Sequence, residues 1–567
     1  MKTSTVEYLE KRIAPATIFV TNLLDDGSPG SLRKAIADAN LTLAPDVIMF
    51  KPTAFGTIVL GGTDLDISNP LTIKGPGAGK VIISGNGASG ILNIAYANNA
   101  TIATTTISGV ALINGNAFDG GAINSQEPLT VVNSIISGST ASNNGGGIFV
   151  KTDGKFTMSG TTVTGNTADA GGGLYLEVTG GISITKSTIS GNTATSGRGG
   201  GAYISTNGGT NLTAKFLVKD TTIVGNTASG DGGGVFLSPD GRDVSVINST
   251  IAGNTAGING GGIFMRIGTL QLKNSTLSGN TADRGGGIYI QVPGTKTSTI
   301  TSTKILNNRA TVTTGGGIQF DGQSSATATL NILKSTIAGN AANVEGGGIA
   351  AENGGKLNLT GDTLFSNSAV TRGGGVYTNG AANQTVVLTV TGSTISENTS
   401  ARAGGIFTGG DGAVTIAKSK LIANRATNNI GGGAYLRSNN PVTITSTLIT
   451  KNSAPHQGGG LIVISSNIIL TGSTLTDNVS GSTGGGAYLS GASSTITKTL
   501  IRGNYAATFG GGLSLNTNTT TIVKSTITGN IAKVGGGGIY RAGGNTTVDA
   551  ATKLFGNVAP VFPDKNF

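Results

Sequence analysis

One short pattern recurs along most of this 567-residue chain and constrains its fold more than any other feature. Each copy holds an aliphatic residue, an asparagine, a variable stretch, three glycines and a second apolar tract. Examples are "STISGNTATSGRGGGAYI" from Ser187 and "STLSGNTADRGGGIYI" from Ser275. Successive asparagines are most often 26 residues apart and at most 34. A repeat of this kind forms one continuous stack of units. Because a reaction needs its residues gathered once, the repetition indicates a structural unit.

Three apolar tracts in each copy predict three short strands. One tract lies eight residues before the asparagine, as at Ile184, and another lies three residues before it, as at Ile189. The last follows the glycines, as in Leu174-Tyr175-Leu176. All are short, β-branched and alternating, which is typical of strands and not of helices. The sequence therefore predicts an all-β fold, a single parallel β-helix with three strands per coil and about 17 coils, ~4.8 Å apart.

A turn-prone residue separates the first two tracts, six positions before the asparagine. It is glycine, asparagine or aspartate in most copies, which fits a residue held at positive φ. Lysine at the same place, as at Lys186 and Lys334, is less expected, and we interpret it as tolerated. The glycine triplet is predicted to let the chain leave a loop of variable length and enter the next strand at tight curvature.

The asparagines are predicted to stack in register as a buried, structural ladder. Buried amides must be hydrogen-bonded, so the ladder has to be complete to be stable. The less regular residues Asn116 and Ser139 are predicted to hold the same place in two earlier copies, and Asn557 ends the series. The predicted ladder comprises Asn166, Asn192, Asn226, Asn254, Asn280, Asn308, Asn340, Asn367, Asn398, Asn424, Asn452, Asn478, Asn504 and Asn530.

The N-terminal part departs from the repeat and predicts a cap. "TIFVTN" indicates a strand, and "DDGSPGSLRKAIADAN" indicates a turn followed by a helix that begins at Ser31 or Ser28. Leu32, Ala35, Ile36 and Ala39 share one face of that helix, which would cover the open end of the core. The expected segments are a possible export or targeting segment (1–16), the cap (17–45), irregular first coils (46–117), regular coils (118–557) and a C-terminal tail (558–567).

Composition excludes several classes of function. The net charge is +10, but the 37 lysines and arginines form no basic run, so we expect no nucleic-acid partner. No stretch reaches the ~18 apolar residues of a membrane helix. The chain has no cysteine, which removes disulfides and thiolate chemistry. We predict no cofactor and no metal, and the oligomeric state stays open.

Several motifs resemble those of known bacterial surface proteins. "GGGIY" and "ISGN" resemble the GGA[ILV] and FxxN repeats of chlamydial polymorphic outer membrane proteins and of autotransporter passengers. "GSPGSLRKAIADAN" is similar to the N-terminal cap of right-handed parallel β-helix repeat proteins, and "LEKRIAPA" to a short N-terminal motif of planctomycete-type exported proteins. The resemblance implies a right-handed, pectin-lyase-like β-helix located outside the cell or on the bacterial surface.

Catalytic groups are sparse in the sequence. Enzymes that cleave polysaccharides on this kind of fold need clustered carboxylates. The nearest feature is a series of loop acids in about every second coil, ~10 Å apart, which is too far for sharing a metal. We expect these acids, Asp119, Asp169, Asp231, Asp283 and Glu345, to be solvated loop charges. The single histidine, His456, has no serine or carboxylate motif beside it and is expected on a loop surface.

Two outward columns remain as candidate binding surfaces. One holds paired hydroxyls such as Thr162-x-Thr164 and Thr188-x-Ser190. The other is aromatic, and its rings either bind sugars or a protein partner, or pack on each other and under the loops. The aromatic column comprises Phe149, Tyr175, Tyr203, Phe236, Phe264, Tyr289, Tyr377, Phe407, Tyr435, Tyr488 and Tyr540.

These features favour a non-enzymatic, secreted or cell-surface β-helix that acts in adhesion, surface scaffolding or the binding of glycans or other surface proteins. A polysaccharide lyase or glycoside hydrolase is the alternative, and an ice-binding threonine array is the second alternative. The sequence predicts neither the ligand nor the route of export.

Overall fold

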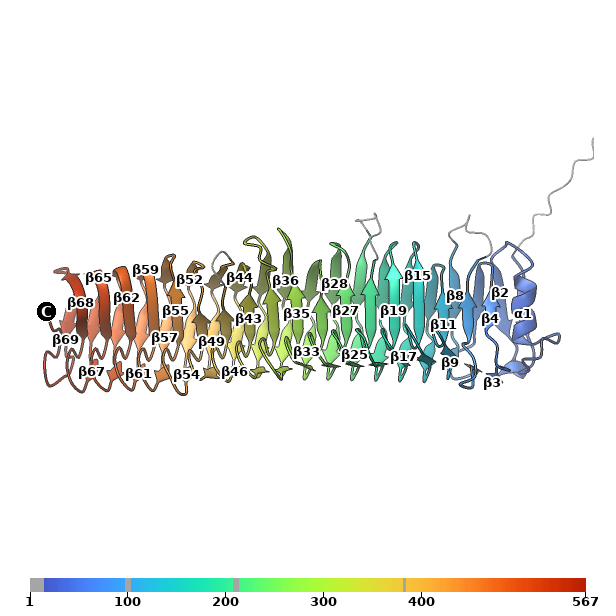
Figure 1. Cartoon of the computed structure of the whole chain (residues 1–567), viewed down its shortest axis with the longest axis horizontal. Helices are drawn as coiled ribbons and strands as arrows, with labels where there is room; N and C mark the ends of the chain where they lie inside the picture. The colour runs from blue at the N-terminus through green and yellow to red at the C-terminus, as the bar shows by residue number, and fades with distance from the viewer. Residues whose placement is uncertain (1–14, 97–102, 207–213, 381–383) are drawn as a thin grey trace, which may run out of the picture. The chain divides into compact units, whose positions relative to one another are not determined.

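The computed structural model describes residues 15–96, 103–206, 214–380 and 384–567. It divides into two compact units, one of Met1–Thr195 with Thr206–Ala214 and one of Ser196–Ser205 with Lys215–Phe567. In each unit the chain winds in coils, and each strand pairs in parallel with the same strand of the next coil (Figure 1). The described residues contain six such coils in the first unit and thirteen in the second, compared with the expected total of about 17.

A representative coil of the first unit contributes to three parallel sheets, here named A, B and C. Strand β16 (Phe156–Ser159) lies in sheet A, β17 (Thr162–Thr164) in sheet B and β18 (Thr167–Ala168) in sheet C. After the glycines, β19 (Leu174–Val178) returns to sheet A. The predicted fold class is therefore confirmed. The first and third predicted tracts belong to the same sheet, and sheet C consists of two-residue strands too short to leave an apolar tract.

Inward columns of aliphatic side chains fill each coil. Val163 pairs in register with Ile189, and Met158 pairs with Ile184. All four are at most 1% exposed. Late in the second unit the two sheet A strands of a coil fuse, as in β59 (Leu461–Thr471) and β62 (Ala487–Thr497). The core is thus a stack of like residues, each contacting its equivalents one coil away.

The bends confirm the predicted positive φ angles. At the position six before the ladder asparagine, φ is 60° at Gly160, 50° at Asn274 and 50° at Lys334. Lysine is thus accommodated there in a conformation that costs a residue with a Cβ about 1–3 kcal/mol. A second position of positive φ directly precedes the asparagine, as at Gly279 with φ 61°.

Each position of the glycine triplet requires glycine for its own physical reason. Gly285 adopts a φ of 64°, which glycine reaches without strain. A Cβ on Gly286 would lie 2.4 Å from the backbone of Arg309, and one on Gly287 would lie 2.5 Å from the carbonyl oxygen of Gly317. Consecutive coils therefore approach so closely here that only glycine fits. Ala403 takes the first triplet position in its coil and adopts a φ of 59°.

The N-terminal cap follows the sequence prediction. Strand β1 (Thr17–Val20) pairs with β2 (Asp46–Phe50), and helix α1 (Leu32–Ala39) buries the four predicted residues of its apolar face. Ser31 is the N-cap, and its hydroxyl accepts a hydrogen bond from the backbone N–H of Lys34 at 3.2 Å. The targeting segment predicted at 1–16 lies outside the described residues up to position 14.

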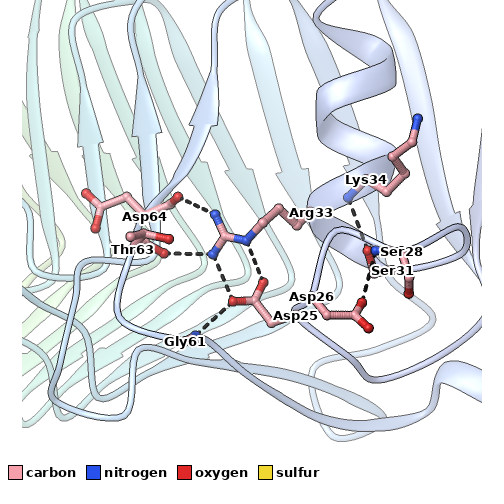
Figure 2. Close-up of polar contacts among 9 residues, drawn as sticks. All are labelled: Asp25, Asp26, Ser28, Ser31, Arg33, Lys34, Gly61, Thr63 and Asp64. Atoms are coloured by element: carbon pink, nitrogen blue, oxygen red, sulfur yellow. Dashed lines mark hydrogen bonds and ion pairs between the residues drawn. The ribbon is translucent and has the colours of Figure 1, made fainter.

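A polar cluster ties the cap helix to the first coils (Figure 2). Arg33 pairs with Asp25, with Nη2 2.8 Å from Oδ2. Its guanidinium also donates to the backbone carbonyls of Thr63 and Asp64, each at 2.8 Å. Asp25 in turn accepts from the backbone N–H of Gly61 at 2.8 Å. One arginine thereby links the helix, the turn before it and the coil below it.

Parallel strands also build the early coils, and the last residues of the chain pair with the coil before them. "TIVLGG", "LTIKG" and "VIISGNG" contain β3 (Gly56–Val59), β5 (Leu71–Lys74) and β6 (Val81–Ser84). Residues 558–567 lie against the preceding coil through isolated parallel bridges, such as Gly535 with Val561. The described part of the chain contains no helix long and apolar enough to span a membrane.

Candidate functional site

The predicted asparagines form a ladder in both units. The backbone N–H and the Nδ2 of Asn280 each donate to the Oδ1 of Asn308, at 3.0 and 2.9 Å. The Nδ2 of Asn280 also donates to the carbonyl of Ile251, in the preceding coil, at 2.9 Å. In the first unit Asn166 makes the same bonds with Asn192. All fourteen predicted asparagines are at most 1% exposed, so the ladder is structural, as predicted.

The first rungs differ from the prediction by one residue. Ser139 is a rung, because its backbone N–H donates to the Oδ1 of Asn166 at 3.0 Å. The rung before Ser139 is Gly115, whose backbone N–H donates to the Ser139 hydroxyl at 3.1 Å. Asn116 was expected there, but its register with Thr140 places it one position later, where it is exposed. A rung with no side chain cannot be recognised from an asparagine pattern.

A second ladder consists of hydroxyl groups and was not predicted from the sequence. It lies five residues before each ladder asparagine, where the residue is serine or threonine in every copy except one, which has Asp362. The N–H of Ser249 donates to the hydroxyl of Ser275 at 3.1 Å, and the N–H of Thr303 donates to that of Ser335 at 3.2 Å. The signal was present in the repeat, but serine and threonine also suit exposed turns. Register was needed to show that they are buried.

Most of the predicted aromatic column packs on itself. In the second unit, Tyr377 and Phe407 stack with ring centroids 5.5 Å apart, and Phe407 and Tyr435 stack at 5.1 Å. Tyr203, Phe236, Phe264 and Tyr289 form a second run of stacked rings. Six rings are at most 8% exposed: Phe236, Phe264, Tyr289, Tyr377, Phe407 and Tyr435. These six cannot contact a ligand without rearrangement. The others, Phe149, Tyr175, Tyr203, Tyr488 and Tyr540, are half-buried.

The two ring runs of the second unit are separated by a polar network. The column passes from Tyr289 to Gln319, Ala350 and then Tyr377. The Tyr289 hydroxyl donates to Asp321 at 3.1 Å, and the Gln319 amide donates to Glu352 at 3.0 Å. Burial raises the pKa of Tyr289 to about 12, with Asp321 adding to the effect. Burial likewise raises the pKa of the Glu352 carboxyl.

The loop acids are engaged with neighbours. Asp231 pairs with Arg198 at 3.1 Å, and Glu345 pairs with Arg372 at 3.3 Å. Asp283 accepts from the hydroxyl of Thr311 at 3.0 Å. His456 is exposed in its loop. Among the described residues no group of three or more acidic or histidine side chains is arranged to hold a metal ion.

The threonine pairs face outward from sheet B, as predicted. The Ser190 hydroxyl donates to that of Thr164, one coil away, at 3.0 Å. Lys304 and Leu306 interrupt the array in the second unit. A further hydroxyl array lies on sheet A of that unit, where Thr389 pairs in register with Thr415, and Thr415 with Thr443.

An open groove lies in the first unit, where the aromatic column begins. The outward positions of β7 (Leu92–Ile94), β11 (Ile123–Ser125), β15 (Ile148–Thr152) and β19 are Asn93, Asn124, Phe149 and Tyr175, paired in register. Two short asparagines thus precede two rings, which stack at 5.4 Å. The step from ring to asparagine leaves a groove of about 730 Å³ that extends over Lys151, Glu177 and the loop at Asp153.

The groove walls are polar. The Oδ1 of Asp119 accepts hydrogen bonds from the side chain of Asn143 and the backbone N–H of Asn144, both at 3.0 Å. Lys151 and Glu177 form an ion pair at 3.1 Å. Two aromatic rings and several amide and carboxylate side chains thus line the same groove. The sequence placed Phe149 and Tyr175 in the column, but the asparagine at 124, which opens the groove, was not recognised.

These features define a right-handed parallel β-helix with a groove on the outer face of sheet A. The family described as a right-handed beta helix region matches residues 75–251, 216–388 and 374–552. The chain therefore belongs to this family. No curated protein matches it.

Among solved structures, the chain is similar to an alginate lyase of family PL6, AlyGC, at 11% identity. The match covers 96% of this chain and 100% of the lyase, with a TM-score of 0.19. A mutant of the same lyase matches at 10% identity, with the same coverage and a TM-score of 0.21.

Proposed function

We propose that this chain is a non-enzymatic, surface-exposed β-helix that binds a glycan in the groove at Asn124 and Phe149, in adhesion or surface scaffolding. The proposal depends on Phe149, the ring at which the aromatic column ends. Phe149 has a ring, Tyr175, on one side and the short Asn124 on the other. Its second face therefore borders a groove lined with amides and hydroxyls, which suit the faces and hydroxyls of a sugar.

The test is the binding of the purified chain to an immobilised panel of oligosaccharides. The Phe149→Ser variant should lose binding, because it removes the ring that a sugar would stack on. Tyr488→Ser is the matched control, since Tyr488 is a half-buried ring of the same column outside the groove. Absence of any bound oligosaccharide, or equal binding by both variants, would contradict the proposal.

We also propose an extracellular or cell-surface location, supported by the resemblance of the repeat and of "LEKRIAPA" to exported bacterial proteins. Treating intact source cells with a protease should degrade the chain while sparing a cytoplasmic marker. Protection of the chain in intact cells would overturn this assignment.

Cleavage of a polysaccharide is a second candidate, and one observation favours it. Asp321 and Glu352 are register partners on neighbouring strands, β39 (Ile318–Asp321) and β43 (Ile349–Glu352). One of the two, Glu352, has a raised pKa, as a general acid requires. Both accept hydrogen bonds from buried partners, however. Release of reducing or unsaturated ends from an acidic polysaccharide, abolished in Glu352→Gln, would establish this activity in place of simple binding.

Ice binding is the remaining alternative, and the register of the sheet A hydroxyl array favours it. Thr389, Thr415 and Thr443 repeat at the strand spacing of ~4.8 Å. A thermal hysteresis measurement on the purified chain tests it. A gap between melting and freezing points that disappears in Thr415→Lys would support this function.

A further inference from the structure

The groove differs in charge from the chain that contains it. The whole chain carries a net charge of +10, whereas the groove-lining side chains within the described residues include three carboxylates and one ammonium group. We propose that the groove selects a cationic amino-sugar polymer over neutral and acidic glycans. This inference rests on the proposed glycan-binding function and assigns the chemical class of the ligand.

The carboxylates lie around the rings. Lys151 and Glu177 follow Phe149 and Tyr175 by two positions on β15 and β19, so all four side chains project from one face of sheet A. The side chain of Glu177 is 13% exposed, whereas the side chain of Lys151 is 58% exposed. The lysine therefore extends into solvent and can move aside. Glu177 stays at the groove wall, where an ammonium group of a ligand can replace the lysine.

The other two carboxylates lie on loops at the groove. Asp153 follows β15 and is exposed, and one of its oxygens accepts a single side-chain hydrogen bond, from Thr179 at 2.9 Å. Asp119 is fixed by Asn143 and Asn144, so its orientation does not have to be ordered on binding. A preorganised carboxylate costs less entropy on binding than a mobile one.

Phe149 adds a second attraction for a cation. The face of an aromatic ring carries negative potential and attracts an ammonium group within about 6 Å. The chain already uses this contact elsewhere, since the guanidinium of Arg372 lies 5.3 Å from the ring centre of Phe407. At Phe149 the neighbour in register on one side is Asn124 and not a ring, so that face remains for a ligand.

An unsatisfied atom independently indicates a missing donor. The Oδ1 of Asn124 is buried without a hydrogen-bond partner among the described residues, and Asn124 lines the groove. A buried acceptor left unpaired costs about 1–3 kcal/mol. Rotation of the half-buried Asn124 side chain would turn this oxygen toward the groove, where an ammonium or hydroxyl group of an amino sugar can supply the missing hydrogen bond. The charge, the ring and the acceptor thus all favour one type of ligand.

Amino sugars fit the groove better than a basic peptide does. Its remaining walls are formed by uncharged side chains such as Asn143, Asn144, Thr152, Thr179 and Gln126. Such side chains pair with the many hydroxyls of a sugar. An acidic polysaccharide would place its carboxylates against Asp153 and Glu177, and like charges at close range oppose binding.

The experiment compares two probes that share one sugar backbone and differ only at the amino groups, which are charged in one and acetylated and neutral in the other. The β-1,4-linked glucosamine hexamer and its N-acetylated counterpart are titrated into the whole chain by calorimetry, at mildly acidic pH and low salt. We expect the glucosamine hexamer to bind ~10-fold more tightly and to weaken as salt is added, because exposed charge pairs are screened. The double variant Asp153→Asn with Glu177→Gln should remove this preference. Glu397→Gln, an exposed acid of the second unit, should keep it.

The outcomes distinguish the two proposals. Equal binding of both hexamers would leave the glycan-binding function standing and overturn the selection for an amino sugar. Tighter binding of a polyuronate hexamer would also overturn the selection. Equal binding of a lysine-rich peptide, abolished by the same double variant, would identify a protein partner instead. If neither hexamer binds and the whole oligosaccharide panel is negative, the proposed function itself fails. Unchanged melting temperatures of the charge variants exclude misfolding as the cause.

Discussion

The outer face of sheet A is built from the same repeat position in two regions that behave differently. In the second unit, Tyr377, Phe407 and Tyr435 stack and are at most 8% exposed. In the first unit, Phe149 and Tyr175 also stack, but Asn124 precedes them and a groove opens beside the ring. A repeat position therefore defines the direction of a side chain. The neighbouring coil and the covering loops define whether it is accessible.

The largest effect tests what the two regions share. Replacing Asn280 or Asn166 by leucine should lower the free energy of unfolding by about 3–5 kcal/mol, because two neighbouring coils lose partners for buried polar groups. Both residues donate the same hydrogen bonds, but Asn280 accepts two from Asn254, whereas Asn166 accepts one from Ser139. The loss at Asn280 should therefore be the larger. Thermal unfolding measures them. An unshifted melting temperature in either variant would mean that its rung is not buried.

The next effect separates the two regions. Phe407→Ala should lower the free energy of unfolding by about 3–4 kcal/mol, because it leaves a cavity between two stacked rings. Phe149→Ala should lower it by only about 1–2 kcal/mol, because the Phe149 ring is half-buried and stacks on a ring, Tyr175, on one face only. Denaturant unfolding gives both values. Equal costs would show that the groove is closed in solution.

A pH-dependent effect concerns the hydroxyl ladder of the second unit. Asp362 replaces a serine or threonine there, and its carboxylate accepts from the N–H groups of Ser335 and Thr360 at 2.7 and 2.8 Å. Burial raises the pKa of Asp362 from 3.8 to about 6. The pKa of Asp362 is higher in the folded chain than in the unfolded chain. The protonated carboxyl therefore adds its full contribution to the free energy of unfolding below pH 3.8, and this contribution is lost as the pH rises through about 6.

Removing this charge should therefore stabilise the chain near neutral pH. Asp362→Ser, which places at this rung a residue type found at the others, is expected to raise the free energy of unfolding at pH 7 by ~1–3 kcal/mol and to change it less at pH 3.5. Asp153→Asn, at an exposed loop acid, is the control and should show no such dependence. Equal stabilisation at both pH values would contradict the assignment.

The smallest effect concerns the bends. Lys334 has a φ of 50° and is exposed, so Lys334→Gly should stabilise the chain by about 0.5–1 kcal/mol through relief of strain. Lys356→Gly, in the regular strand β44 (Gly355–Thr360), should instead destabilise it, because glycine weakens a strand. If both variants changed the stability in the same direction, the positive φ angle of Lys334 would not explain the effect.

The sequence predicted the cap helix and the regular coils because their signals are local. Ser31 and the face formed by Leu32, Ala35, Ile36 and Ala39 lie within three turns of one helix. The asparagine ladder was predictable because the same residue type recurs at each bend. The hydroxyl ladder and the rung at Gly115 were missed because their roles depend on register, which places partners 24 to 32 residues apart side by side.

The sequence by itself determined the coil, its bends and the direction of each side chain, because a repeat imposes the same local geometry on every copy. Only the tertiary structure decided which outward residues are accessible. Phe407 is buried between two stacked rings, Tyr377 and Tyr435. At Phe149 the neighbour is Asn124, and a groove opens there, because a short side chain leaves space beside the ring and no loop of the described residues covers that space.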